Sequence, residues 1–221
     1  MNRILLVRHG STDHNRAGLM RGWTDDPLSA LGRRQAALTA AALMGQEPTA
    51  AGVFCSTLPR AVETAQILAQ ALALPVLPRD DLRELNLGDM EGQTEQALWD
   101  YYLRQAAPEP GHAGPRDVVF PGGESIAGFM HRTRAALADI GARHAGAVLV
   151  VSHGVQTMLA LGLWLEPDVT RWPAYRVDNC SLTEVAFEPA PRLVRLNDTR
   201  HLRGADRPAG GPAADTGLAS G

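Results

Sequence analysis

Three short apolar runs in this sequence end in polar residues that suit the binding of an anion. The runs are 4–7, 51–55 and 147–151, and the residues after them are Arg8-His9-Gly10, Ser56-Thr57-Leu58-Pro59-Arg60 and Ser152-His153-Gly154. Runs this short and this apolar are typical of strands buried on both faces. In open α/β sheets, ligands bind beyond the carboxyl ends of the strands. We therefore expect Arg8, His9, Arg60 and His153 to meet at one edge of a sheet.

Two arginines and two histidines in one place suit a single phosphoryl group. Guanidinium groups offer planar pairs of donors that match phosphate or carboxylate oxygens. A glycine or a helix start follows each cluster, and backbone N–H groups there favour an anion. The chain has no lysine and no Walker-type glycine loop, which disfavours a nucleotide polyphosphate. An imidazole held against a phosphoryl group can attack it and form a covalent intermediate.

A leaving alcohol would need an acid, and an attacking water would need a base. One carboxyl can serve both steps in turn, and Glu84 is the candidate because it follows the short apolar segment 75–77. Two histidines also suit a metal ion, but arginines at the same strand ends would repel a cation, so we predict no metal site. The other histidines are assigned no role, and we expect the cluster His131-Arg132-Arg134 to lie on the exposed face of a helix. Those other histidines are His14, His112, His131, His144 and His201.

The elements that must position these side chains alternate between strand and helix. Helical spacing of apolar residues predicts helices over 29–45, 57–72, 126–140 and 155–165, the first capped by Ser29. Runs at 182–187 and 193–196, separated by Pro189 and Pro191, predict a hairpin and hence an antiparallel edge strand. Alternating strands and helices imply an α/β fold with a mostly parallel sheet covered on both faces. The Pro- and Gly-rich stretch 108–123 is interpreted as a long loop that closes over the site.

Length and composition indicate one globular domain. The chain has 221 residues, of which 45% are hydrophobic and 20% charged, with a net charge of −3. We assign 1–203 to the domain and 204–221 to a disordered tail, since the tail has no hydrophobic periodicity. A pI near 6.2 gives no electrostatic case for nucleic acid. The longest apolar stretches, 145–151 and 155–165, are too short to span a membrane, and Cys55 and Cys180 make no disulfide framework. We therefore predict a cytoplasmic protein. The exposed edge of the predicted hairpin could pair with a second copy of the chain to form a homodimer.

The order and spacing of these motifs resemble the histidine phosphatase superfamily, whose fold is that of phosphoglycerate mutase. The resemblance covers residues 3–203. It rests on Leu6-Val7-Arg8-His9-Gly10-Ser11-Thr12, Asn15, Gly22-Trp23-Thr24-Asp25-Asp26-Pro27-Leu28-Ser29, Ser56-Thr57-Leu58-Pro59-Arg60-Ala61, Arg83-Glu84, Glu91-Gly92, Pro121-Gly122-Gly123-Glu124-Ser125, Ser152-His153-Gly154, Asn179-Cys180-Ser181 and Leu196-Asn197-Asp198.

The resemblance implies a role for each candidate residue. His9 would be the phosphorylated nucleophile and Glu84 the proton donor to the leaving group. The phosphoryl oxygens would be held by Arg8, Arg60 and His153, with Asn15 close by. The implied fold is a three-layer α/β/α sandwich, and the implied chemistry needs no metal or cofactor.

The superfamily contains both phosphatases and mutases. Glycolytic mutases carry Glu-Arg-His-Tyr-Gly around the acid, whereas this chain has Glu84-Leu85-Asn86-Leu87-Gly88, with leucines where the mutase grips a second acidic group. The pattern from Arg83 to Gly92 resembles the phosphatases, while Arg21-Gly22-Trp23 is similar to the mutases. We therefore expect a metal-independent phosphomonoesterase that acts on small phosphorylated metabolites. The alternatives are a cofactor-dependent phosphoglycerate mutase and a non-catalytic phosphoester-binding module.

Overall fold

A six-stranded mixed sheet forms the centre of the molecule. The computed structural model describes residues 3–44, 51–107, 114–144 and 146–205. The strands are β1 (Arg3–Arg8), β2 (Val53–Ser56), β3 (Val76–Arg79), β4 (Ala147–Ser152), β5 (Leu182–Ala186) and β6 (Arg192–Asp198). Their order is β3-β2-β4-β1-β5-β6. The first four strands pair in parallel, β5 runs antiparallel to β1, and β6 runs antiparallel to β5. The predicted parallel sheet with an antiparallel edge is confirmed.

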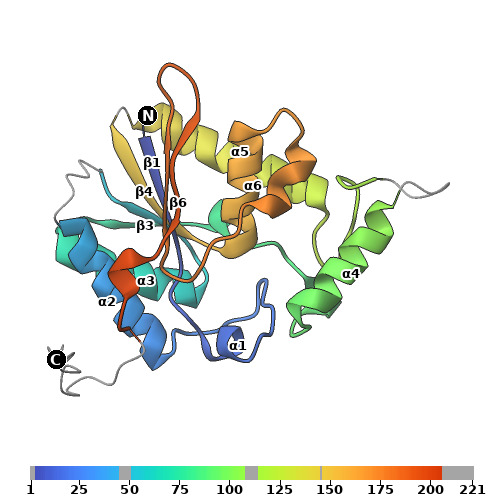
Figure 1. Ribbon diagram of the computed structural model, residues 1–221, viewed down its shortest axis with the longest axis horizontal. Coiled ribbons are helices and arrows are strands. Elements are labelled where there is room, and N and C mark those ends of the chain that lie inside the picture. The colour runs from blue at the N-terminus through green and yellow to red at the C-terminus, as the bar shows by residue number, and fades with distance from the viewer. Residues whose placement is uncertain (1–2, 45–50, 108–113, 145, 206–221) are drawn as a thin grey trace, which may run out of the picture.

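Helices cover both faces of this sheet. Figure 1 shows α2 (Ala30–Met44) and α3 (Pro59–Leu72) on one side, with α5 (Ile126–Arg143) and α6 (Gly154–Leu165) on the other. Side chains alternate along β1, so Leu5 and Val7 pack toward α2 and α3 while Ile4 and Leu6 pack toward α5 and α6. Burial on both faces explains why the central strands are uninterrupted apolar runs. The predicted three-layer α/β/α sandwich is confirmed.

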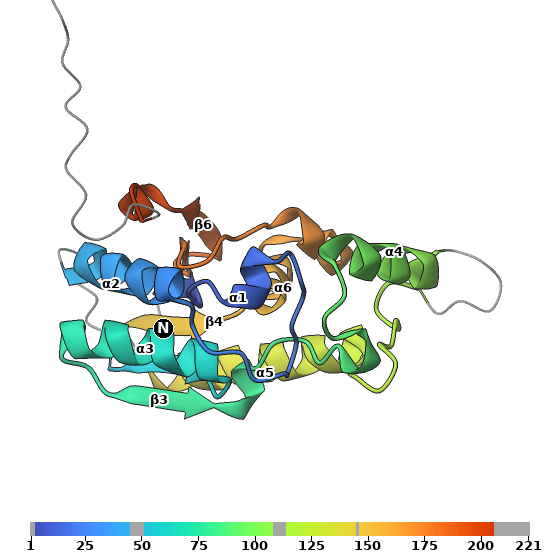
Figure 2. The ribbon, with the colours of Figure 1, turned by 90° about the horizontal axis from the view of Figure 1, so that it is seen from below.

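The sequence prediction missed the helix α4 (Glu95–Ala106), which belongs to neither layer. It begins at Thr94, whose side chain accepts a hydrogen bond from the N–H of Ala97. Figure 2 shows it beyond the end of α5, far from α2 and α3. Its buried side chains, Leu98 and Tyr102, join a third apolar cluster with the short 3₁₀ helix η3 (Val169–Ala174). The cluster also contains Phe129 of α5 and Met158 of α6, so it joins α4 and η3 to the helical layer on that face of the sheet.

Two predicted irregular segments are described only in part. Of the expected long loop 108–123, residues 114–123 form turns, and Val119 bridges to Ser125. The remainder, 108–113, lies outside the described residues. Of the expected tail, Gly204 and Ala205 form a turn in which Ala205 is buried, and 206–221 lies outside the described residues. Across the described ranges, we find no helix long and apolar enough to cross a bilayer.

Candidate active site

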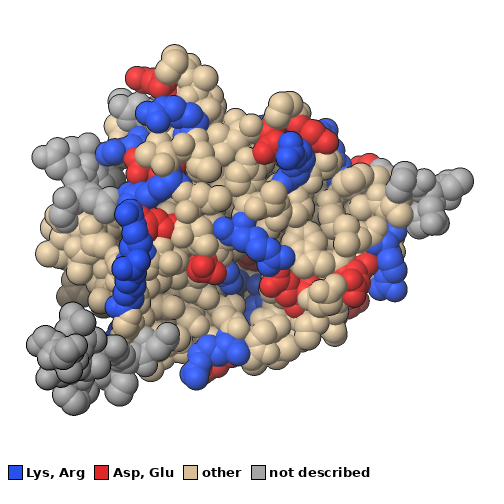
Figure 3. All heavy atoms as spheres, in the orientation of Figure 1, with Lys and Arg blue, Asp and Glu red and all other residues tan. Residues whose placement is uncertain are grey.

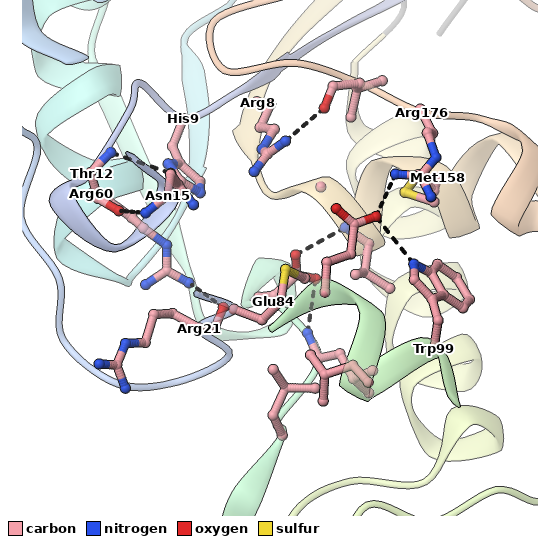
Figure 4. A pocket seen from close by; sticks show the side chains of 18 of the residues that line it. Arg8, His9, Thr12, Asn15, Arg21, Arg60, Glu84, Trp99, Met158 and Arg176 are labelled. Atoms are coloured by element: carbon pink, nitrogen blue, oxygen red, sulfur yellow. Dashed lines mark hydrogen bonds and ion pairs between the residues drawn. The ribbon is translucent and has the colours of Figure 1, made fainter. Parts of the chain in front are cut away.

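The six predicted site residues come together at the carboxyl ends of the parallel strands. Arg8, His9, Asn15, Arg60 and Glu84 line one cavity of about 200 Å³. The ring of His153 lies next to that of His9, with 5.2 Å between the ring centroids and 59° between the ring planes. Figure 3 shows a hollow between the region of α1 (Asp13–Arg16) and α4, with arginine and carboxylate side chains around it. In Figure 4 Glu84 lies between two groups of side chains: His9, Asn15 and Arg60 on one side, and Trp99 and Arg176 on the other.

The geometry of His9 suits a nucleophile. Its Nδ1 lies 2.8 Å from the carbonyl oxygen of Gly10. A carbonyl only accepts hydrogen bonds, so Nδ1 carries the proton and Nε2 keeps its lone pair. Burial, and then the positive charges of Arg60 and Arg8, lower the pKa of His9 well below its usual value. The imidazole is therefore neutral at neutral pH, as attack on phosphorus requires. A Cβ on Gly10 would lie 2.5 Å from the carbonyl oxygen of Gly32, so this turn requires glycine.

Arg8 and His153 hold buried polar atoms that have no protein partner. Arg8 donates one hydrogen bond through Nη1 to the carbonyl of Val177 at 2.7 Å. Its Nε and both ring nitrogens of His153 are buried without a hydrogen-bond partner among the residues that the structure describes. Leaving a buried donor unpaired costs about 1–3 kcal/mol. Burial lowers the pKa of His153 well below its usual value, so its neutral ring carries one N–H. An anion bound beside His9 would supply acceptors for that N–H and for Nε of Arg8.

The Arg60 side chain is fixed by the loop that precedes α2. Arg60 is the second residue of α3, which begins with Pro59, and only 2% of its surface is exposed. Its guanidinium donates to the carbonyls of Gly22 at 2.7 Å and Thr24 at 3.2 Å. A charge at the start of a helix is ordinarily solvated, whereas these contacts hold Arg60 against the cavity.

Asn15 is oriented by its neighbours so that its amide can donate. Thr12 caps the short helix α1, and the Oδ1 of Asn15 accepts from the N–H of Thr12 at 3.2 Å. The same oxygen accepts from Nδ2 of Asn179 at 3.2 Å, and that Nδ2 also donates to the carbonyl of His9 at 2.9 Å. With the acceptor oxygen occupied, the Asn15 amide offers donors to a further acceptor.

Glu84 occupies the N-terminus of α6. Its Oε1 accepts from the N–H groups of Leu85 at 2.9 Å and Gln156 at 3.0 Å, and its Oε2 accepts from Val155 at 2.9 Å. The first turn of α6, expected to attract the anion, thus binds this carboxylate instead. Burial raises the pKa of Glu84 above its usual value. The N–H groups of Leu85 and Val155, and the charges of Arg60 and Arg8, act in the opposite direction. A carboxyl with a raised pKa can carry a proton to a leaving group.

The prediction that Arg132 lies on an exposed helix face is wrong. Only 19% of its side chain is exposed, and its carboxylate partner is Glu124, whose Oε2 lies 2.8 Å from Nη2. It donates to the carbonyls of Asp81 at 3.0 Å, Arg83 at 2.8 Å and Glu84 at 3.1 Å. The side chain of Arg132 therefore extends from α5 to the segment that carries Glu84 and holds that segment by hydrogen bonds to three of its carbonyls. Its neighbours His131 and Arg134 are exposed, as expected.

The structure places the other histidines that it describes outside the phosphate-binding group. His14 pairs with the buried Asp26 at 2.9 Å, and Asp26 lines the cavity. Nε2 of His201 lies 3.0 Å from the carbonyl oxygen of Cys180. His144 packs on Phe54, and His112 lies outside the described residues.

Sequence reasoning missed the side chains that form the far wall of the cavity. Glu95, Trp99 and Arg176 line it together with Trp172. Thr94, followed by Leu98 and Tyr102 at a spacing of four, was the available signal for α4. No local pattern could bring η3 and residue 176 to the same cavity, because their contacts with α4 are distant in sequence.

Comparison with known proteins agrees with this architecture. The family model for the histidine phosphatase superfamily (branch 1) matches residues 4–199. The probable phosphoglycerate mutase GpmB of Yersinia enterocolitica is 36% identical over 95% of this chain and 97% of its own length. A mycobacterial glucosyl-3-phosphoglycerate phosphatase solved with VO3 has a TM-score of 0.76 at 29% identity, over 90% of this chain and 100% of that chain.

A second solved structure has the same fold and holds a phosphorylated small molecule. The phosphoserine phosphatase of Entamoeba histolytica, in complex with 3-phosphoglyceric acid, has a TM-score of 0.73 at 28% identity, over 91% of this chain and 100% of that chain. The sequence match and the shared fold together confirm the resemblance carried by the motifs. This chain belongs to the histidine phosphatase superfamily, branch 1.

Proposed function

We propose that this protein is a metal-independent phosphomonoesterase that works through a phosphorylated His9. One observation carries the proposal: next to a neutral His9, Arg8 and His153 have buried nitrogens for which the described part of the chain offers no hydrogen-bond partner. A phosphoryl oxygen would accept hydrogen bonds from Nε of Arg8 and from the one N–H of the neutral His153 ring, and phosphorus would meet the Nε2 lone pair of His9. Members of this family act on phosphorylated small molecules, and this chain would do the same.

The proposed reaction has two steps. In the first, Nε2 of His9 attacks phosphorus, the P–O bond to the alcohol breaks, and Glu84 gives its proton to the leaving oxygen. In the second, the Glu84 carboxylate takes a proton from a water molecule whose oxygen attacks phosphorus, so the P–N bond breaks and phosphate leaves. Arg8, Arg60 and His153 would stabilise the charge on the transferred group in both steps, and such prearranged donors supply the largest part of many rate enhancements.

A phosphoglycerate mutase is the second candidate, favoured by the name of the relative from Yersinia enterocolitica. Such an enzyme would use the same nucleophile but pass the phosphoryl group to a second hydroxyl of its acidic substrate. Leu85 and Leu87, which replace the arginine and tyrosine of the glycolytic mutases, both line the cavity. The two leucines have no hydrogen-bond donor and no positive charge with which to bind the carboxylate of a phosphoglycerate. Their presence supports phosphatase activity over mutase activity.

Phosphorus NMR distinguishes the two activities. The protein is incubated with 3-phosphoglycerate, a bisphosphoglycerate primer and a chelator, and in parallel with an aryl phosphate. We expect inorganic phosphate from the aryl ester and no 2-phosphoglycerate. Rapid formation of 2-phosphoglycerate would establish the mutase instead. Loss of aryl phosphate turnover in chelator, with recovery on adding a divalent cation, would contradict metal independence.

A further inference from the structure

The cavity continues beyond the phosphate-binding group to a wall of aromatic rings. Trp99 of α4 packs on Trp172 of η3, with 5.6 Å between ring centroids and 35° between planes. Tyr102 meets both rings edge-on, at 5.7 Å from Trp99 and 6.0 Å from Trp172. Trp172 and Tyr102 are buried at 4% and 6% exposure, whereas Trp99 is half-buried and faces the cavity (Figure 4). Two rings thus hold a third in a fixed position.

Further apolar side chains line this half of the cavity. Leu98, Phe120 and Met158 line it beside Trp99, and Leu85 and Leu87 line the side nearest Glu84. A leaving alcohol bound to a phosphoryl group at His9 would extend past Glu84 into this space. Flat rings pack well on such a surface, because aromatic pairs gain stacking in addition to the burial of area.

The charged groups at this end of the cavity already pair with one another. The carboxylate of Glu95 forms an ion pair with Arg176 and accepts a hydrogen bond from Nε1 of Trp99 at 3.2 Å. Arg176 is therefore engaged by a carboxylate of the protein. A carboxylate on the substrate would have to compete with Glu95 for that guanidinium and would meet its negative charge. Solvent weakens this effect, since the side chain of Glu95 is 48% exposed.

From this arrangement we infer that the enzyme selects phosphomonoesters whose alcohol carries a flat, uncharged ring. The ring lies against Trp99, and Glu95 disfavours an acidic group at the same place. This inference rests on the proposed function, since it assumes that the phosphoryl group binds at His9. The inference predicts that an acidic substrate such as a phosphoglycerate binds weakly.

Phosphonates test the inference without turnover, because their P–C bond is not hydrolysed. Calorimetry measures the dissociation constants of methylphosphonate, benzylphosphonate and 4-carboxybenzylphosphonate for the full chain. We expect benzylphosphonate to bind about tenfold more tightly than methylphosphonate, as a stacked and buried ring implies. The 4-carboxy compound should bind at least threefold more weakly than benzylphosphonate. Equal binding of benzyl- and methylphosphonate, or tightest binding of the 4-carboxy compound, would overturn the inference.

Variants assign the selectivity to the wall. Trp99→Ala should bring the benzyl-to-methyl affinity ratio close to one, while Trp99→Phe should keep most of it. Trp164→Phe is the matched control, because Trp164 packs on Phe187 beside the sheet and does not line the cavity. Glu95→Gln should narrow the gap between the benzyl and 4-carboxybenzyl compounds, and Asp100→Asn, a charge on the same helix outside the cavity, should not. An unchanged benzyl-to-methyl ratio in folded Trp99→Ala would refute the role of Trp99.

The inference and the proposed function fail in different ways. If the phosphonates bind in the expected order but benzyl phosphate is neither hydrolysed nor forms phosphohistidine, the proposed chemistry is wrong and the ring site stands. If benzyl phosphate is hydrolysed but the phosphonates show no preference for the ring, the chemistry stands and the ring site is wrong.

Discussion

Replacing Glu84 with glutamine separates its chemical role from its structural one. The carboxylate accepts three backbone N–H groups, two at Oε1 and one at Oε2. A glutamine keeps one acceptor oxygen, so its NH₂ would face the N–H of Val155 or those of Leu85 and Gln156. One buried donor loses its partner in the better orientation. This predicts a loss of about 1–3 kcal/mol in the free energy of unfolding, measured by urea denaturation.

The effect of Glu84→Gln on rate should depend on the leaving group. Positioned proton transfer contributes about 10²–10⁴-fold to rate. Benzyl phosphate, whose alkoxide leaves poorly without a proton, should lose a factor of this size in kcat. The 4-nitrophenolate ion leaves without protonation, so 4-nitrophenyl phosphate should lose less than about tenfold in its first step. Asp89→Asn, an exposed carboxylate on the same segment, is the control.

Two results would refute this reasoning. Equal slowing of both esters would mean that Glu84 does not donate a proton to the leaving group. An unfolding free energy equal to that of the unaltered protein would contradict the predicted loss, because it would mean that removal of the buried charge offsets the lost backbone contact in full. Glutamine has no carboxyl proton to lose. The decrease in kcat/KM for benzyl phosphate at alkaline pH, which we assign to deprotonation of Glu84, should therefore be absent from this variant.

The remaining predictions concern pH and the placement of Glu84. The pKa of His9 is lowered and that of Glu84 is raised. We therefore expect kcat/KM for benzyl phosphate to decrease at pH values below the pKa of His9 and at pH values above the pKa of Glu84. A kcat/KM that does not change with pH would contradict both assignments. His9 and His153 have lowered pKa values, so the unfolded chain binds more protons below about pH 6.5 and stability falls there by about 1.4 kcal/mol per pH unit for each histidine. His9→Gln should therefore gain stability relative to the unaltered protein as pH falls from about 7 to about 5.5 in urea titrations, and a constant difference would refute the assignment. Arg132→Lys should lower kcat for benzyl phosphate at least tenfold through misplacement of Glu84 and should shift its alkaline pKa, whereas the exposed control Arg134→Lys should do neither.

The sequence predicts the parts of the site that depend on local signals. The polar clusters after β1, β2 and β4 follow uninterrupted apolar runs, and strand geometry alone brings Arg8, His9, Arg60 and His153 to one edge. Asn15 was predicted as a site residue only from the family resemblance, because the spacing of residues 8–15 does not show how its amide is oriented. Glu84 could be proposed as an acid, but its attachment to the N-terminus of α6 could not be derived.

Contacts between distant segments explain what was missed. Arg132 looked like a solvated charge because its partners, the carbonyls at 81, 83 and 84, lie about fifty residues earlier in the chain. Every residue has a backbone carbonyl, so the sequence does not show which carbonyls accept a hydrogen bond from an arginine. The wall of Trp99, Tyr102 and Trp172 has the same origin, because it forms only when α4 packs on η3.

The most direct test of the central claim is the trapping of phosphorylated His9. The protein is mixed with excess 4-nitrophenyl phosphate in chelator, quenched within milliseconds in alkali, where phosphohistidine survives, and digested for mass spectrometry. We predict one acid-labile phosphoryl group on the peptide that contains His9, absent from His9→Ala and present in the exposed control His131→Ala. Turnover without any phosphorylated peptide, or retained turnover in pure His9→Ala, would contradict the account.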